Sequence, residues 1–489
     1  MIEIMLFLIR GEGYIPRPLG RLKKVCTPSP IPLKNNIPRL FRAGLLIFTL
    51  LQPLQAQEEP TPATISKLEE QRRDTLRFGT ETEIASLIQT IKNEKVDYLD
   101  NELIEIAEKT RNRNVLSGIF SFFADMEKNG LEERAIRAVS ERDQESYDSV
   151  LAAIDYLGSV KSGESLDCLE DLVNSGESRY LNTAFRALGR ASSSEDPDGV
   201  ASFLLDYYIN RSPGNELQRE IIVAIGETGS KEGVSFLAEL VKNTSERVPL
   251  RMAALEAMSK IGDAEGLDSV IEAVTSDDPN VRSSAVAALA PFSGEAVDNA
   301  ILEAFRDSFW RTRIGAAQAA GKRRLLSAIP YLRYRAENDD VPNVKDEAIK
   351  ALGAINNEET SSILDSLFSE RKNSDRVRIT AAEMLIQNDA DNFSKRVYAE
   401  MEEARSKNLT ALYNGFIRVM GTAKSQSLED IILRFISGGI IEKSLALDLI
   451  LSNEFRGLEE EIRSLLDEKV HSASIARKAQ STLEKLGLE

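Results

Sequence analysis

The chain has 489 residues, of which 42% are hydrophobic and 28% are charged, a composition that excludes disorder throughout. Its 78 acidic and 61 basic residues give a net charge of −17, which argues against a nucleic-acid partner because phosphate binding requires a basic surface. Two cysteines, Cys26 and Cys168, cannot form a disulfide framework, and one histidine, His471, argues against a histidine-based metal site or a Ser/His/Asp relay. Catalysis through carboxylates or lysine stays open.

The first 62 residues differ in kind from the rest, because nine of the 16 prolines lie at or before Pro62. A basic flank at 39–42 precedes an apolar core at 43–51, and Ala56 precedes the acidic start of the next segment. This order is typical of a secretory signal peptide. We therefore expect residues 1–56 to be an N-terminal extension and signal peptide, cleaved near Ala56, and the mature protein to be exported to the periplasm.

Two alternatives to export stay open at this stage. A transmembrane anchor is disfavoured, because nine apolar residues at about 1.5 Å each cover roughly half of a bilayer core. The signal begins late, at about residue 39, and Leu54 stands where a small residue is usual, so translation starting downstream of Met1 is one explanation of residues 1–38. A vestigial apolar run would leave a cytoplasmic protein. Cleavage would leave 53 basic and 76 acidic residues, a net charge of −23, which is unsuited to an anionic membrane surface.

After a polar lead-in or helical linker at 57–78, residues 79–489 show a repeat of 31–37 residues. A basic residue opens the second helix of each central unit, at steps of 31, 31, 32 and 33 residues. We call these the anchor residues: Arg251, Arg282, Arg313, Lys345 and Arg378. An apolar residue precedes each anchor except Arg313, which follows Thr312. Small or apolar residues then recur on one helical face: Ala254, Met258 and Ile261; Ala285, Leu289 and Phe292; Ala316, Ala320 and Leu325; Ala348, Leu352 and Ile355.

A partner helix fills the other half of each unit, for example at 267–274, and another opens at Ile329. Gly229 and Gly262 stand where one helix ends, and we expect each to take the left-handed conformation of a helix cap. The pattern predicts about 11 or 12 helix pairs between residues 79 and 489. Two helices per unit and no strand signal predict an all-α fold, an α-solenoid of stacked antiparallel helix pairs.

The turn Asp277–Arg282, followed by Ala285 and Leu289, resembles the HEAT repeat, most closely the short, alanine-rich bacterial form related to phycocyanobilin-lyase-type repeats. The resemblance is best over 218–400. A tetratricopeptide array has a similar period, but its Trp/Gly/Tyr/Pro pattern is absent. The resemblance implies an armadillo-like scaffold whose anchor-led helices line the concave side.

Several residues could be interpreted as functional, but each has a simpler structural interpretation. Trp310 is expected to pack over its turn and not to read a distorted base. The anchor residues are expected to form a structural ladder by pairing with acids of their own turns: Glu246, Asp278, Asp307, Asp340 and Asp375. The acidic runs 402–403 and 459–461 lack calcium-loop spacing and are expected to be solvated faces. His471 is expected at the surface.

These observations predict a non-catalytic, exported protein-interaction scaffold with no catalytic, cofactor-binding or metal-binding residues, no cofactor and no membrane span in the mature chain. The partner is a protein of unknown identity, and its binding residues are unknown. The alternative is a HEAT-like enzyme of the lyase type or, less favoured, the DNA-glycosylase type, or a cytoplasmic regulatory scaffold. Outward positions of the anchor-led helices are the first candidates for partner contacts: Met252, Glu256, Ser283, Gln318, Asp346, Lys350, Glu383 and Arg418.

Overall fold

The computed structural model describes residues 67–467 and 470–488, and the predicted signal peptide and its apolar core at 43–51 lie outside these residues. The described part of the chain contains 25 α-helices and six short 3₁₀ turns, and no strand. The predicted all-α fold is therefore confirmed. None of the described helices combines the length and apolar character that crossing a membrane would require.

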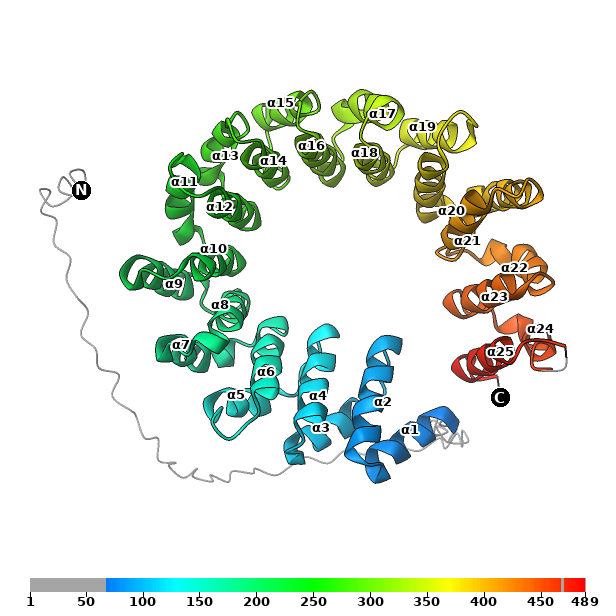
Figure 1. Ribbon diagram of the computed structural model, residues 1–489, viewed down its shortest axis with the longest axis horizontal. Helices are drawn as coiled ribbons and strands as arrows, with labels where there is room; N and C mark the ends of the chain where they lie inside the picture. Colours follow the sequence, from blue (N-terminus) through cyan, green and yellow to red (C-terminus); the bar gives the residue numbers. More distant parts are fainter. Residues whose placement is uncertain (1–66, 468–469, 489) are drawn as a thin grey trace, which may run out of the picture. The chain divides into compact units, whose positions relative to one another are not determined.

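The helices alternate between two layers of a curved array (Figure 1). The outer helices are α1 (Lys67–Phe78), α3 (Asp100–Lys109), α5 (Glu132–Ser140), α7 (Leu166–Ser175), α9 (Pro197–Arg211), α11 (Val234–Lys242), α13 (Leu267–Ala273), α15 (Glu295–Ala304), α17 (Ile329–Asn338), α19 (Glu358–Ser369), α22 (Glu429–Ile436) and α24 (Glu459–Ser464). The inner helices are α2 (Glu81–Glu94), α4 (Arg113–Asp125), α6 (Tyr147–Ser159), α8 (Ser178–Ser192), α10 (Asn215–Thr228), α12 (Val248–Ile261), α14 (Pro279–Ala288), α16 (Trp310–Arg323), α18 (Pro342–Ile355), α21 (Thr410–Met420), α23 (Ile440–Ser452) and α25 (Ala473–Leu486). The anchor residues open inner helices, as predicted.

Most helix pairs pack on the pairs before and after them mainly through their inner helices, and the segment after α21 is contacted by α20. The face predicted from the repeat is buried, and its members at the first two positions are each at most 1% exposed: Ala254, Met258, Ala285, Leu289, Ala316, Ala320, Ala348 and Leu352. Neighbouring repeats therefore share one continuous apolar core, as expected for a solenoid.

Glycine allows successive inner helices to approach closely. A Cβ atom on Gly226 of α10 would lie 2.6 Å from the Cα atom of Ala257 on α12, and one on Gly189 of α8 would lie 2.5 Å from the carbonyl oxygen of Ala224 on α10. Both distances are shorter than atoms can adopt, so any larger residue would push the two repeats apart.

The helix ends follow local chemistry. The Asp278 carboxylate accepts hydrogen bonds from the amides of Asn280 and Val281, which caps α14. Gly229 and Gly262 have φ values of 70° and 66° at the ends of α10 and α12, so the predicted left-handed caps are confirmed.

Helix α20 (Asp375–Ser406) breaks the two-layer pattern in a way that the repeat did not predict. It is 32 residues long and kinks at Asp389, whose φ of −155° and ψ of 74° are not helical. The Asp389 carboxylate accepts a hydrogen bond from the Asn392 amide, as an N-cap does. The segment before the kink is thus an inner helix and the segment after it starts a new pair with α21, so 12 pairs follow α2 in the described residues.

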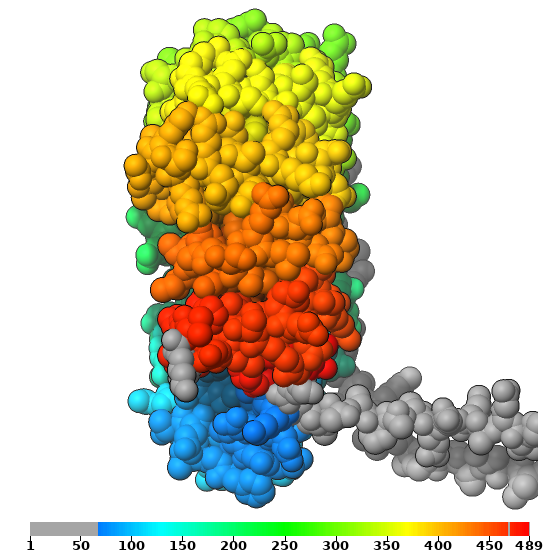
Figure 2. Space-filling model, turned by 90° about the vertical axis from the view of Figure 1, so that its right-hand side faces the viewer, coloured from blue at the N-terminus to red at the C-terminus, as the bar shows by residue number. Residues whose placement is uncertain are grey.

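Helices from both ends of the described array place a cation near Glu94 of α2. Helix α1 covers much of the segment predicted to be a lead-in, and its Arg72 binds Glu94 of α2 at 2.5 Å. Lys485 of α25 lies 4.0 Å from the same carboxylate of Glu94. Figure 2 shows the helices from α19 to α25 as layers stacked in sequence order.

Candidate functional site

The anchor residues show first how the repeats are joined. Each anchor donates a hydrogen bond to a backbone carbonyl at the end of its own outer helix or in the turn that follows. The pairs are Arg251 with Val241 (3.0 Å), Arg282 with Ser276 (2.9 Å), Arg313 with Asp307 (3.0 Å), Lys345 with Glu337 (2.7 Å) and Arg378 with Phe368 (2.9 Å). This bond secures the turn within one repeat.

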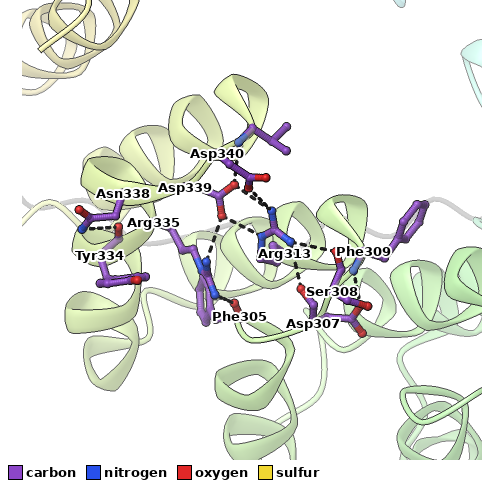
Figure 3. Close-up of polar contacts among 11 residues, drawn as sticks. Phe305, Asp307, Ser308, Phe309, Arg313, Tyr334, Arg335, Asn338, Asp339 and Asp340 are labelled. Carbon is purple, nitrogen blue, oxygen red and sulfur yellow. Dashed lines mark hydrogen bonds and ion pairs between the residues drawn. The ribbon is translucent and has the colours of Figure 1, made fainter.

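The carboxylate partners lie in the next repeat (Figure 3). Arg313 binds Asp339 with two hydrogen bonds of 2.8 Å each, and Arg282 binds Asp307 at 2.9 and 3.2 Å. Arg378 likewise binds Glu400, beyond the kink of α20, at 2.6 Å. These bonds join consecutive repeats.

The prediction that each anchor pairs with an acid of its own turn is therefore wrong. The members of that set serve other roles or meet other partners: Glu246, Asp278, Asp307, Asp340 and Asp375. Asp278, for example, accepts the hydrogen bonds that cap its own helix, and Arg282 instead reaches Asp307 of the next repeat. A structural ladder exists, but its ion pairs connect one repeat to the next, at Arg282, Arg313 and Arg378.

We call each contact between an anchor residue and a carboxylate of the next repeat a joint. Burial makes the ionisation of the carboxylates in these joints important. Burial raises the pKa of the Asp339 carboxyl, but hydrogen bonds from the Arg313 guanidinium and the Val341 amide outweigh it and hold that pKa below its ordinary value. Asp307 has a lowered pKa for the same reasons, through Arg282 and the Phe309 amide. Both aspartates are therefore ionised in the folded protein at neutral pH.

Arg251 and Lys345 bind the backbone carbonyl of their own repeat but have no carboxylate partner in the next repeat among the described residues. In the described structure, no carboxylate lies within ion-pair distance of Arg251, although its residue is only 6% exposed. Asp307 and Asp339 each stand three residues before the next inner helix, and Ser276 holds that position after Arg251. Since the ladder faces the protein interior, we assign it to structure and not to ligand binding.

A hollow on the inner helices is the candidate binding site. It has a volume of about 660 Å³ and is formed by α10, α12, α14 and α16. Its lining residues are Arg219, Pro249, Met252, Ala253, Glu256, Ser259, Lys260, Ser284, Ala287, Ala288 and Lys322. The volume is in the range of ligand pockets, and small side chains leave its floor open.

Charged side chains surround this floor. Arg219 contacts Glu220 at 3.0 Å, and Lys260 contacts Glu227 at 2.7 Å and Glu256 at 3.7 Å. Lys322, exposed near the end of α16, has no acidic partner among the described residues. The hollow can therefore offer at least one uncompensated cation to a ligand.

Of the predicted contact positions, the structure brings only Met252 and Glu256 into this hollow. Ser283 and Gln318 lie on the neighbouring inner helices α14 and α16, half-buried and exposed respectively. The remaining positions are distributed farther along the array, on α18, α20 and α21: Asp346, Lys350, Glu383 and Arg418. Asp346 is held by Arg376 of the next inner helix at 2.6 Å.

The sequence interpretation missed Arg219, Lys260 and Lys322. A signal was available, because α14 and α16 contain five basic residues and no Asp or Glu in a chain of net charge −17. The repeat pattern alone does not show that Arg219, Lys260 and Lys322 meet, because they come from three helices, α10, α12 and α16, and the first and last are more than 100 residues apart in the chain.

Other residues considered from the sequence have structural surroundings. Trp310 is half-buried at the start of α16, and the Arg311 guanidinium lies 5.0 Å from its ring centre. His471 Nδ1 lies 3.3 Å from Lys443 Nζ. Burial raises the pKa of the Cys168 thiol to about 12, which keeps it protonated at neutral pH. Within the described residues, no three His, Cys, Asp or Glu side chains are grouped so as to hold a metal ion.

Residues 76–482 match the family described as spirochaete HEAT repeat protein. The chain belongs to this family. The HEAT resemblance predicted from the turn and helix pattern is thus confirmed, and it extends well beyond the central repeats at 218–400. A search of the curated proteins finds no match.

Solved structures with a similar fold include Kap121p, with 11% identity and a TM-score of 0.40, covering 85% of this chain and 53% of that one. The complex of CpcE and CpcF of phycocyanin lyase from Nostoc sp. PCC7120 shows 14% identity and a TM-score of 0.31, covering 59% of this chain and 94% of that one. Human deoxyhypusine hydroxylase shows 14% identity and a TM-score of 0.24, covering 53% of this chain and 98% of that one. This chain spans about half the length of Kap121p.

Proposed function

We propose that this HEAT repeat protein is a non-catalytic scaffold that binds a protein partner on its inner helices. The observation that carries the proposal is the hollow of about 660 Å³ across α10, α12, α14 and α16. The apolar faces of the repeats are buried against one another, whereas the surface of this hollow stays accessible. A protein surface or segment can bury such a shallow site over several repeats, which is how solenoids use their concave side.

We also propose that the protein works outside the cytoplasm, in the periplasm. The support is the order of basic flank, apolar core at 43–51 and Ala56 in the sequence. N-terminal sequencing of the protein from separated cell fractions tests this part. A start near Gln57 in the periplasmic fraction is the expected result, and an uncleaved N-terminus in the cytoplasm would overturn it.

The binding surface can be tested by placing a photo-crosslinking amino acid at Gln318, exposed on inner helix α16. The matched control is Asn299, an exposed amide on outer helix α15. We expect a partner protein to crosslink in cells at position 318 and not at 299. Crosslinking at 299 alone would place the interface on the outer helices and overturn the proposal, as would turnover of a small molecule by the purified protein with no partner at either position.

A further inference from the structure

Charge is segregated between the two helix layers in the middle of the array. The six inner helices from α8 to α18 contain 13 Lys or Arg and six Asp or Glu residues, a net charge of +7. The six outer helices from α7 to α17 contain four basic and 12 acidic residues, a net charge of −8. In this part of a chain of net charge −17, the inner helices are therefore net positive and the outer helices net negative.

Part of this inner charge is structural and is not available to a ligand. Arg251, Arg282 and Arg313 turn toward the joints between repeats, and Arg323 binds Asp298 of α15 at 2.5 Å. Arg186 is held by Glu220 at 2.7 Å. The cations that reach solvent without an acidic partner are therefore the informative ones.

Two exposed cations with no acidic partner within the described residues lie on α16, a helix that contains no Asp or Glu. Arg311 is exposed in its first turn and stacks only on aromatic rings, and Lys322 is exposed at its other end, on the wall of the hollow. Gln318 lies one turn before Lys322 and is also exposed. The neighbouring inner helix α14 presents Ser283, Ser284 and Ala287 and no carboxylate.

The other wall of the hollow contributes Lys260 and Arg219 beside Glu256. The acids there already have basic partners, because Glu256 and Glu227 face Lys260 and Glu220 faces Arg219. Binding of a carboxylate near Lys322 would therefore bring no unpaired acid into contact with it. The acidic residues elsewhere on the protein would repel a long polyanion such as a nucleic acid.

We propose that the hollow over α12, α14 and α16 binds an acidic, extended segment of the partner protein, with Lys322 as the main cationic contact. The inference rests on the proposed scaffold function and adds the chemistry of the partner. The small residues Ala253, Ser284 and Ala287 leave room for the peptide backbone. Lys322, which has no acidic partner among the described residues, selects carboxylate side chains.

The test measures fluorescence anisotropy of labelled 12-residue peptides added to the full chain. The probes are an alternating Glu/Ser peptide, a Lys/Ser peptide, a Gly/Ser peptide and a single-stranded dT oligonucleotide of equal length. We expect the Glu/Ser peptide to bind tightest and to weaken as salt is added, because exposed charges are screened. Equal binding of the Gly/Ser peptide, or no binding of the acidic one, would overturn the inference, and tighter binding of the oligonucleotide would replace the acidic segment with a nucleic acid.

Lys322→Glu is the decisive variant, because Lys322 has no ion-pair partner to lose among residues 67–467 and 470–488. We expect about tenfold weaker binding of the Glu/Ser peptide, since an attraction becomes a repulsion. Lys395→Glu is the matched control, because Lys395 is exposed on the second half of α20 and has no ion-pair partner in the part of the chain that the structure describes. An equal loss in both variants would show a general charge effect and overturn the site.

The two proposals fail separately. If the Gln318 crosslink forms as strongly in Lys322→Glu as in the wild-type background, the scaffold function stands and the acidic-segment inference fails. If no partner crosslinks at position 318, the scaffold function itself fails, whatever the peptides show.

Discussion

Arg313 and Arg251 occupy the same position in two repeats, yet their guanidinium groups are satisfied differently. Arg313 binds both oxygens of Asp339, a side chain that is 0% exposed, and Arg251 binds one backbone carbonyl. The difference comes from the residue three positions before the next inner helix, which is Asp339 in one case and Ser276 in the other. A repeated residue therefore does not imply a repeated energy, because its partner lies in a different repeat.

The largest effect that we expect is on the complete joint. Arg313→Leu leaves the Asp339 carboxylate buried without its main partner, which costs about 3 kcal/mol of unfolding free energy. Arg251→Leu is the matched control and is expected to change the unfolding free energy by less than about 1 kcal/mol, because it strands no acid. Urea denaturation, with hydrogen exchange to locate the change, measures both. Equal losses would contradict the distinction between the two joints.

The same joint predicts a pH dependence. The folded pKa of Asp339 lies below its ordinary value of 3.8, so the stabilisation is complete above that value and is lost as the pH falls through the lowered pKa. Asp339→Asn is expected to lose about 2 kcal/mol at pH 7. The difference from wild type should shrink as acid protonates Asp339. Unfolding measured at a series of pH values checks this, and a constant difference would mean that the carboxylate charge is irrelevant.

Thr312 distinguishes the Arg313 repeat from its neighbours in a second way. It is 1% exposed and its hydroxyl has no hydrogen-bond partner among the described residues, whereas Val281 and Val344 hold the equivalent positions. Thr312→Val should therefore raise the unfolding free energy by about 1 kcal/mol. The reverse change, Val281→Thr, should lower it by about the same amount. A loss of stability in Thr312→Val would show that the hydroxyl has a partner after all.

The smallest effect that we expect comes from supplying Arg251 with the carboxylate partner that it lacks among the described residues. Ser276 and Arg251 line the same hollow of about 460 Å³, so Ser276→Asp can present a carboxylate to Arg251. We expect a gain of about 0.5 kcal/mol, limited by the nearby acids Asp277 and Asp278. The gain should disappear in the Arg251→Leu background. Its persistence there would show that the new carboxylate acts elsewhere, for example as a helix cap.

How far sequence reasoning reached depends on the distance between the residues involved. It predicted the face of Ala285 and Leu289 and the left-handed caps at Gly229 and Gly262, because these depend on neighbours within one or two turns. It did not predict the kink at Asp389, where neither glycine nor proline marks the break. It also assigned Arg282 to Asp278, because the nearest acid in the chain is not the nearest acid in space.

The candidate site shows the same division. The sequence by itself determined that this protein is an all-α HEAT repeat array and that Met252 and Glu256 face outward from an inner helix. Only the tertiary structure decided that Arg219, Lys260 and Lys322 surround those residues and that Arg313 meets Asp339. Helical periodicity is a local property of the chain, whereas the meeting of side chains from different repeats depends on how the stacked helices are spaced and rotated.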